Sequence, residues 1–219
     1  SSLDRAATLN RFNDTYYRTL SEGLLMQVSD QLEVITNTDT LTTDSEQYIQ
    51  SLVAAAVNAS ATATELSPNN VANWLTRGLV YRELVPIQGS AAEFALESFG
   101  RAVVLEPANP SHWTEFGKAY LVAADAVQPL TAAENKEAAT KAQNSFNNLL
   151  EGAESAFNTA VELKSNYAPA HFQLGVVYQR QGRLDDSIGK LESVAQYNTL
   201  DVGVHFELGL LYLQRNITG

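Results

Sequence analysis

Apolar residues recur every three or four positions along most of the chain, which is the spacing of one face of an α-helix. Near the start this spacing joins Leu20, Leu24, Val28, Leu32 and Ile35. We therefore expect one helix over about 3–35, a polar turn over 36–43 and a second helix over about 44–66. The two helices are predicted to form a hairpin.

Four later segments share a ring, a glycine and a tyrosine at one spacing. The ring lies four positions before the glycine, and the tyrosine lies three positions after it. On a helix these offsets place all three residues on one stripe, where the glycine leaves room for a neighbouring helix. In chain order the segments are Trp74/Gly78/Tyr81, Trp113/Gly117/Tyr120, His171/Gly175/Tyr178 and His205/Gly209/Tyr212.

A second helical stripe follows each of the first three segments. It has a small residue, a large residue four positions later and a small or branched residue three positions after that. The small residues admit a partner helix, and the large one fills the gap. The stripes are Ala95/Phe99/Ala102, Ala153/Phe157/Ala160 and Ser187/Leu191/Val194, and a weaker one, Ala56/Ser60/Ala63, precedes them.

These paired stripes resemble the tetratricopeptide repeat, a helix-turn-helix unit of about 34 residues. The interval from Gly175 to Gly209 equals one such repeat, whereas the two intervals before it, between Gly78, Gly117 and Gly175, are longer. The resemblance implies an all-α fold, an α-solenoid of such repeats over 71–219, with insertions at about 84–90 and 121–148. Residues 1–70 are then a divergent N-terminal helical hairpin that caps the solenoid.

The larger insertion contains signals for a helix end and a helix start. Pro129 is expected to end one helix, and Thr131 with Glu134 forms a capping-box pattern for the next. That next helix is predicted to be unusually long and to end at about Leu163. Its polar first part, residues 134–148, is expected to be solvated and to lie outside the core.

The last repeat is predicted to stop after its first helix, at about 202–215, and to lack a second helix. The apolar face of that helix, with Leu208 and Leu211, would then be uncovered, whereas terminal repeats normally have a polar outer face. We expect either that the natural protein continues beyond Gly219 or that another copy covers this helix.

The chain is acidic, with a formal net charge of −11, which argues against nucleic acid as a partner. Residues 19–76 contain neither Lys nor Arg. This stretch is either a solvated acidic face or a docking surface for a basic partner. Its carboxylates are Glu22, Asp30, Glu33, Asp39, Asp44, Glu46 and Glu65.

The sequence offers no recognisable catalytic, metal or cofactor chemistry. It has no cysteine, and no phosphate loop, nucleophile elbow or zinc-protease pattern occurs. His171 and His205 hold equivalent ring positions in the repeats, where packing is the expected role, and His112 has no carboxylate cluster beside it. No apolar run reaches the roughly 20 residues of a membrane span. We expect a protein that is not an enzyme, needs no cofactor and does not insert this segment into a membrane.

In the family that the repeats resemble, the first helix of each repeat lines a concave groove that binds peptides or helices. The resemblance transfers this role to positions six and three before each glycine, and one and four after it. A clamp of basic residues for a C-terminal carboxylate is not expected, because among these groove positions only Arg82 and Lys118 are basic. The later part of the groove is apolar, and the chain itself or another copy could fill it instead of a ligand. The groove residues implied are Leu75, Leu79, Arg82, Thr114, Lys118, Leu121, Phe172, Val176, Gln179, Phe206, Leu210 and Leu213, with Ala72, Ser111, Pro169 and Gly203 at the first position of each set.

Three functions remain open from the sequence. The first is a non-catalytic protein-interaction scaffold that binds a partner peptide or helix in the partly apolar groove. The second is the soluble repeat tail of a larger membrane-anchored protein, such as a bacterial polysaccharide polymerase or ligase of the O-antigen type. The third is a self-assembling module that associates through the uncovered C-terminal helix.

Overall fold

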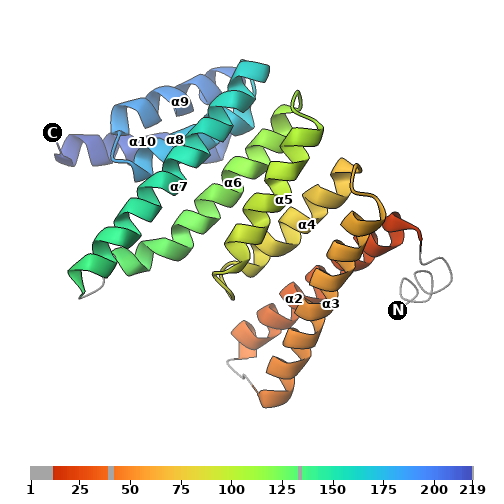
Figure 1. The fold of residues 1–219 in the computed structure, drawn as a ribbon. Helices are drawn as coiled ribbons and strands as arrows, with labels where there is room; N and C mark the ends of the chain where they lie inside the picture. The colour runs from red at the N-terminus through yellow and green to blue at the C-terminus, as the bar shows by residue number, and fades with distance from the viewer. Residues whose placement is uncertain (1–11, 39–41, 133–134, 219) are drawn as a thin grey trace. The chain divides into compact units, whose positions relative to one another are not determined.

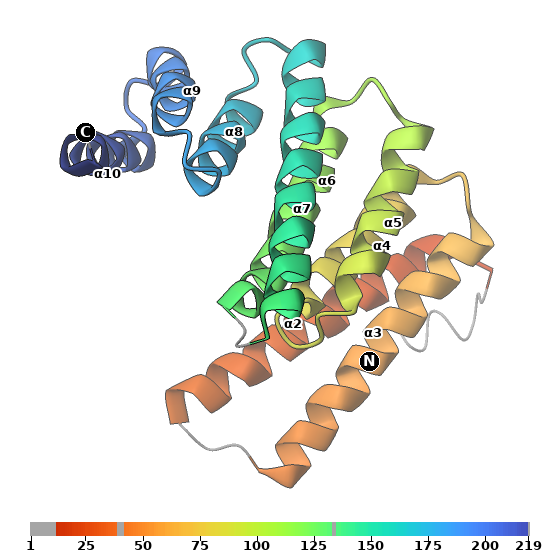
Figure 2. The same cartoon turned by 60° about the vertical axis from the view of Figure 1, so that its left-hand side comes forward.

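The computed structural model describes residues 12–38, 42–132 and 135–218. Within these ranges the chain forms nine α-helices and one short 3-10 helix, and no strand (Figures 1 and 2). The predicted all-α fold is confirmed. The chain divides into two compact units, of which the first ends at Leu105 and the second begins at Glu106.

The first unit consists of two consecutive helical hairpins. Helix α3 packs against α2, α4 packs against both of them, and α5 packs against α4. Val28, Ile49 and Leu52 are buried between α2 and α3, with Leu24 and Ile35 packed against them. Leu24, Val28 and Ile35 of the predicted apolar stripe therefore face the hairpin partner, whereas Leu32 is 37% exposed. The bounds are α2 (Asp14–Thr38), α3 (Thr43–Leu66), α4 (Val71–Leu84) and α5 (Ala91–Leu105).

The first helix begins later than its apolar pattern predicted. Phe12 and Asn13 are not helical, so a continuous helix from residue 3 is wrong; residues 3–11 themselves lie outside the described part. The side chain of Asn13 accepts a hydrogen bond of 3.0 Å from the backbone N–H of Thr15. Asn favours such a capping position, where it satisfies a free N–H of the first turn.

A polar contact around the buried Asn73 joins the start of α2 to the last turn of α3 and the first turn of α4. The Asn73 side chain is fully buried, and its Nδ2 donates to Asp14 Oδ2 at 2.7 Å and to the Ala63 carbonyl at 2.9 Å. The hydrogen bond from Asn73 lowers the pKa of Asp14. These bonds cross residue 70, so the predicted boundary between a hairpin at 1–70 and a solenoid at 71–219 falls inside the first unit.

The second unit begins with a long hairpin and continues with three shorter helices. Helix α7 packs against α6, and α8, α9 and α10 follow, each against the helix before it (Figure 2). One apolar core lies among α6, α7 and α8, and another among α8, α9 and α10. The bounds are α6 (Pro110–Val127), the 3-10 helix η1 (Gln128–Ala132), α7 (Lys136–Leu163), α8 (Ala168–Arg180), α9 (Leu184–Tyr197) and α10 (Val202–Thr218).

Two expectations about the larger insertion are wrong. Thr131 does not cap the long helix, because it lies in η1 and its hydroxyl donates to the Gln128 carbonyl at 2.7 Å. The cap is Asn135, whose side chain accepts from two N–H groups of the first turn of α7. The first part of α7 is also not wholly solvated, since Ala142 and Phe146 are each only 8% exposed. The insertion lengthens α6 as well as α7, so α6 covers one side of the added turns.

The glycines of the first three repeats lie where a second helix comes close, as predicted, whereas Gly209 is exposed. A Cβ placed on Gly78 would lie 2.8 Å from the ring of Phe99, and one on Gly175 would lie 3.0 Å from Leu191. A Cβ on Gly117 would overlap the ring of Phe157. The large residue of each second stripe thus packs directly on the glycine of its own repeat.

Candidate functional site

The residues predicted to line a groove fall into two groups, one in each unit. Leu75, Leu79 and Arg82 lie on α4 in the first unit, and each is partly exposed. The Arg82 guanidinium lies 5.6 Å from the centre of the Phe99 ring and 3.5 Å from Glu83. The other residues lie on α6, α8 and α10 in the second unit, and they can be assessed together there.

Lys118 and Phe172 line one hollow of about 400 Å³ in the second unit. Pro169 and Gly203, which the repeat register also placed in the groove, line it with them. The register therefore brought together residues that lie on three different helices and far apart in the chain. Val194, a member of the predicted stripe with Ser187 and Leu191, also lines it. The lining residues that the sequence did not single out are Ala168, Gln173, Asp201 and Val204.

The charges in this hollow are few and already have partners. Lys118 Nζ lies 2.8 Å from Glu115 Oε1, one turn earlier on α6. Asp201 accepts a hydrogen bond of 3.1 Å from the N–H of Val204 at the start of α10. With one cation and one anion among its lining residues, the hollow favours apolar contact over the recognition of charge.

The outward face of α10 is an apolar stripe. Phe206 is 63% exposed, Leu213 is 61% exposed and Leu210 is 43% exposed. The stripe continues to Val202 and Ile217, which are also exposed and which the repeat register missed. The steps between these five positions are three or four, the spacing of one helix face, so periodicity could have identified them.

Four predicted groove residues are less accessible than the stripe. Thr114 and Leu121 on α6 are buried, and the Thr114 hydroxyl donates to the Pro110 carbonyl at 2.9 Å. Leu121 belongs to the core among α6, α7 and α8. Val176 and Gln179 on α8 are half-buried. Phe172 on α8 is half-buried as well, and of these three α8 residues it is the one that lines the hollow.

The rings that precede the repeat glycines have a structural role. The indole N–H of Trp74 donates to the Pro68 carbonyl at 2.7 Å, and that of Trp113 donates to the Pro107 carbonyl at 2.8 Å. His171 and His205 make the same contact with a carbonyl six positions earlier, at 2.7 and 3.1 Å. Each ring holds the turn that leads into its repeat. His171 is also buried, as the packing interpretation predicted, whereas His205 is exposed.

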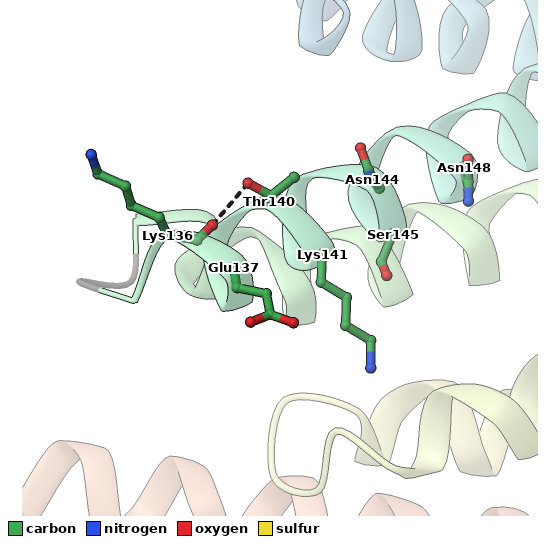
Figure 3. Close-up of a pocket in the computed structure, with 7 residues that line it drawn as sticks. All are labelled: Lys136, Glu137, Thr140, Lys141, Asn144, Ser145 and Asn148. Atoms are coloured by element: carbon green, nitrogen blue, oxygen red, sulfur yellow. Dashed lines mark hydrogen bonds between the residues drawn. The ribbon is translucent and has the colours of Figure 1, made fainter.

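A second, shallower hollow lies on the first half of α7 (Figure 3). All of its lining residues come from this one helix, and the side chains of Lys136 and Lys141 extend away from each other. The Thr140 hydroxyl donates within the helix, to the Lys136 carbonyl at 2.8 Å. This surface is the solvated face of a helix and brings no distant parts of the chain together.

The acidic stretch of the first unit does not converge on one point. Glu22 accepts a hydrogen bond of 2.9 Å from Thr76, and the carboxylates of Asp30, Glu33 and Asp44 are exposed. Asp39 lies outside the described residues. In the described ranges no three His, Asp or Glu side chains are grouped as metal ligands would be. Within the same ranges, no helix has the length and apolar character to cross a membrane.

The fold matches solved structures of repeat proteins. MamA from Desulfovibrio magneticus RS-1 is similar with a TM-score of 0.57 and 16% identity, over 91% of this chain and 84% of MamA. Another MamA structure gives a TM-score of 0.54 with 20% identity, over 81% of this chain and 86% of that MamA chain. TTC0263, a thermophilic TPR protein of Thermus thermophilus, gives 0.53 and 21% identity over 78% of both chains. The predicted tetratricopeptide-repeat fold is confirmed.

Comparison at the level of sequence adds no further relative. No protein-family model matches the chain, and no curated protein matches it either.

Proposed function

Because the chain has the tetratricopeptide-repeat fold, we propose that it is a non-catalytic interaction scaffold that binds a peptide or helix of a partner protein. The contact surface in this proposal is formed by Phe172 on α8 and by Phe206, Leu210 and Leu213 on α10. The observation that supports it is the exposure of three large apolar side chains on one face of α10, next to a hollow lined by Phe172.

The energetics are adequate for a transient complex. Burial of one exposed Leu or Phe side chain contributes about 1.5–3 kcal/mol. Several such side chains together can outweigh the loss of translational and rotational freedom on association. Since the hollow has one cation and one anion among its lining residues, a ligand that inserts an apolar side chain fits it best.

The proposal is tested by selecting ligands on the full chain with a displayed peptide library and measuring the affinity of the selected peptide. We expect Phe206→Asp and Leu210→Asp each to weaken its binding by about ten- to a hundredfold, because each places a charge in the apolar contact. Both side chains are exposed in the free protein, so circular dichroism should show unchanged helicity.

Val104→Asp is the matched control for these variants. Val104 is 67% exposed and lies on α5 in the first unit, so the same chemical change is made away from the proposed surface. Its affinity should stay within about twofold of the wild type. An equal loss in all three variants, or no selected peptide at all, would contradict the proposal. Sedimentation that shows a dimer broken by Phe206→Asp would indicate instead that a second copy occupies the stripe.

A further inference from the structure

The hollow lined by Phe172 combines an apolar wall with two groups of opposite charge. The ring of Phe172 is half-buried, and the Lys118 ammonium and the Asp201 carboxylate belong to the same lining. A side chain that enters the hollow has to be compatible with the ring, the carboxylate and the ammonium together. Naming that side chain rests on the proposed function, because it belongs to the partner peptide or helix.

The Asp201 carboxylate can accept a further hydrogen bond. One of its oxygens accepts from the N–H of Val204 at 3.1 Å, and the other accepts from the side chain of Asn198 at 3.3 Å. An ionised carboxylate has about four lone-pair sites, so these two bonds leave acceptor capacity. Among the described residues no ion pair involves Asp201. A hydrogen-bond donor is therefore the group that complements it.

The Lys118 ammonium already has a carboxylate partner. Its Nζ lies 2.8 Å from Glu115 Oε1. A carboxylate on the ligand would have to compete with Glu115, and a cation on the ligand would share the hollow with the ammonium. An aromatic face can approach an ammonium that keeps its ion pair, because the ring quadrupole attracts the cation. The two charges therefore favour a neutral aromatic side chain that has a donor.

The chain itself contains a side chain in such surroundings. The indole N–H of Trp74 donates to the Pro68 carbonyl at 2.7 Å, and the Arg77 guanidinium lies 5.5 Å from the centre of the same ring. One indole thus combines a hydrogen bond at its edge with a cation over its face. The hollow offers the same combination, an acceptor and a cation, beside an apolar wall.

We infer that the hollow binds a tryptophan side chain of the partner. The indole would lie against the Phe172 ring, with its N–H donating to Asp201 and its face towards Lys118. Leucine and phenylalanine have no donor, and a tyrosine ring attracts a cation less strongly than an indole does. The volume of about 400 Å³ is at the small end of the range of about 300–1,000 Å³ for ligand sites, so it suits one large side chain.

N-acetyl-tryptophanamide is the first probe. It is titrated into the isotope-labelled full chain, and amide chemical shifts locate the contact. We expect saturable binding with a Kd below about 10 mM, and the largest shifts at Phe172, Gly203 and Val204. N-acetyl-naphthylalaninamide is the matched ligand, because it has two fused rings but no N–H. It should bind about fivefold or more weakly than the tryptophan probe, since the bond to Asp201 is lost.

Asp201→Asn is the matching variant of the protein. Asparagine also caps a helix well, so the start of α10 is kept, but its oxygen is needed for the cap and its nitrogen is a donor. The tryptophan probe should bind about fivefold or more weakly, whereas the naphthyl probe should change by less than about twofold. Asp44→Asn makes the same change at an exposed position of α3 and should leave both affinities within about twofold.

Four results would overturn the inference. They are equal affinity of the two probes for the wild type, an equal loss of both probes in Asp201→Asn, and shifts confined to residues outside the hollow. The fourth is a dimer in sedimentation that the tryptophan probe dissociates, which would assign the hollow to a second copy.

The peptides selected from the displayed library separate this inference from the proposed function. We expect them to share a tryptophan whose replacement by leucine weakens binding about tenfold or more. If they bind through Phe206 and share no such tryptophan, the scaffold proposal stands and the tryptophan inference is wrong. If no peptide is selected, the scaffold proposal fails, while the titration with the two probes still tests the hollow.

Discussion

Helices α8 and α10 occupy equivalent places in successive repeats but differ in how much of each is covered. The sides that face the preceding helix are alike, since Leu174 and Val177 on α8 and Leu208 and Leu211 on α10 are all buried. The sides that carry the repeat glycines differ. Gly175 is covered by Leu191 of α9, whereas Gly209 is exposed.

This difference shows that one stripe of sequence can form core or surface. The local pattern determines that a helix forms and which side is apolar. Burial of that side depends on whether another element packs there. The same substitution at two matched positions, one on α8 and one on α10, should therefore change the free energy of unfolding by different amounts. The difference measures how much the helix that packs on the glycine side of α8 contributes.

The largest effect is expected at the matched leucines. Leu174→Ala should lower the free energy of unfolding by about 3–5 kcal/mol, because its surroundings on α6, α7 and α8 cannot close around the cavity. Leu208→Ala should cost only about 2 kcal/mol, because α10 can shift towards α9. Urea unfolding followed by circular dichroism measures both. Equal losses would mean that α10 is held as firmly as α8.

The glycines are expected to give effects of opposite sign. Gly175→Ala should destabilise the chain by about 1–2 kcal/mol, since its Cβ would lie 3.0 Å from two atoms of Leu191. Gly209→Ala should stabilise it by about 0.5–1 kcal/mol, because alanine is the better helix former and meets open space. The same urea experiment compares them. A loss of stability in both variants would show that Gly209 is covered in solution.

The smallest difference is expected between the pKa values of the matched tyrosines, Tyr178 and Tyr212. Burial, followed by the charge of Glu154, raises the pKa of Tyr178, whereas the hydrogen bond to Glu192 raises the pKa of Tyr212 above the ordinary 10.0. Both raised pKa values mean that the folded state favours the protonated phenols. The resulting contribution to the free energy of unfolding is complete below about pH 10 and is lost as the pH rises through the folded pKa values. Glu192→Gln should lower the pKa of Tyr212 and leave that of Tyr178 unchanged.

Ultraviolet absorbance titrations measure this effect. Tyr178→Phe and Tyr212→Phe variants, each with and without Glu192→Gln, identify which phenol titrates. If Glu192→Gln shifts the pKa values of Tyr178 and Tyr212 equally, the two tyrosines are coupled. The comparison between α8 and α10 then fails at the tyrosines.

The local parts of the fold were predictable from the sequence. The offsets between Gly78 and Tyr81, or between Phe99 and Ala102, lie within one or two helical turns, so a single segment contains the whole signal. The contact of Gly78 with Phe99 followed because small and large residues recur in the same order in each repeat. The position of Phe172 beside Lys118 followed from the repeat register in the same way.

The predictions that were wrong depend on which of two nearby residues caps a helix, or on how long a neighbouring helix is. Thr131 and Asn135 are both good caps, and the backbone takes up η1 before the second of them, which no spacing rule indicates. Ala142 and Phe146 are buried because α6 is longer than the usual first helix, and the length of one helix is not encoded in the polarity of another. Leu121 is buried by the same added turns.

The ring that ties each repeat to its preceding turn also gives each unit its own optical reporter. The sequence has two tryptophans, and they occupy equivalent positions: Trp74 lies in the first unit and Trp113 in the second. Each indole is bonded to a turn carbonyl that unfolding would expose to water. Chains with Trp74→Phe or Trp113→Phe therefore report the melting of one unit at a time by fluorescence. Coincident curves mean that the units melt as one cooperative block, and separate curves give the stability of each.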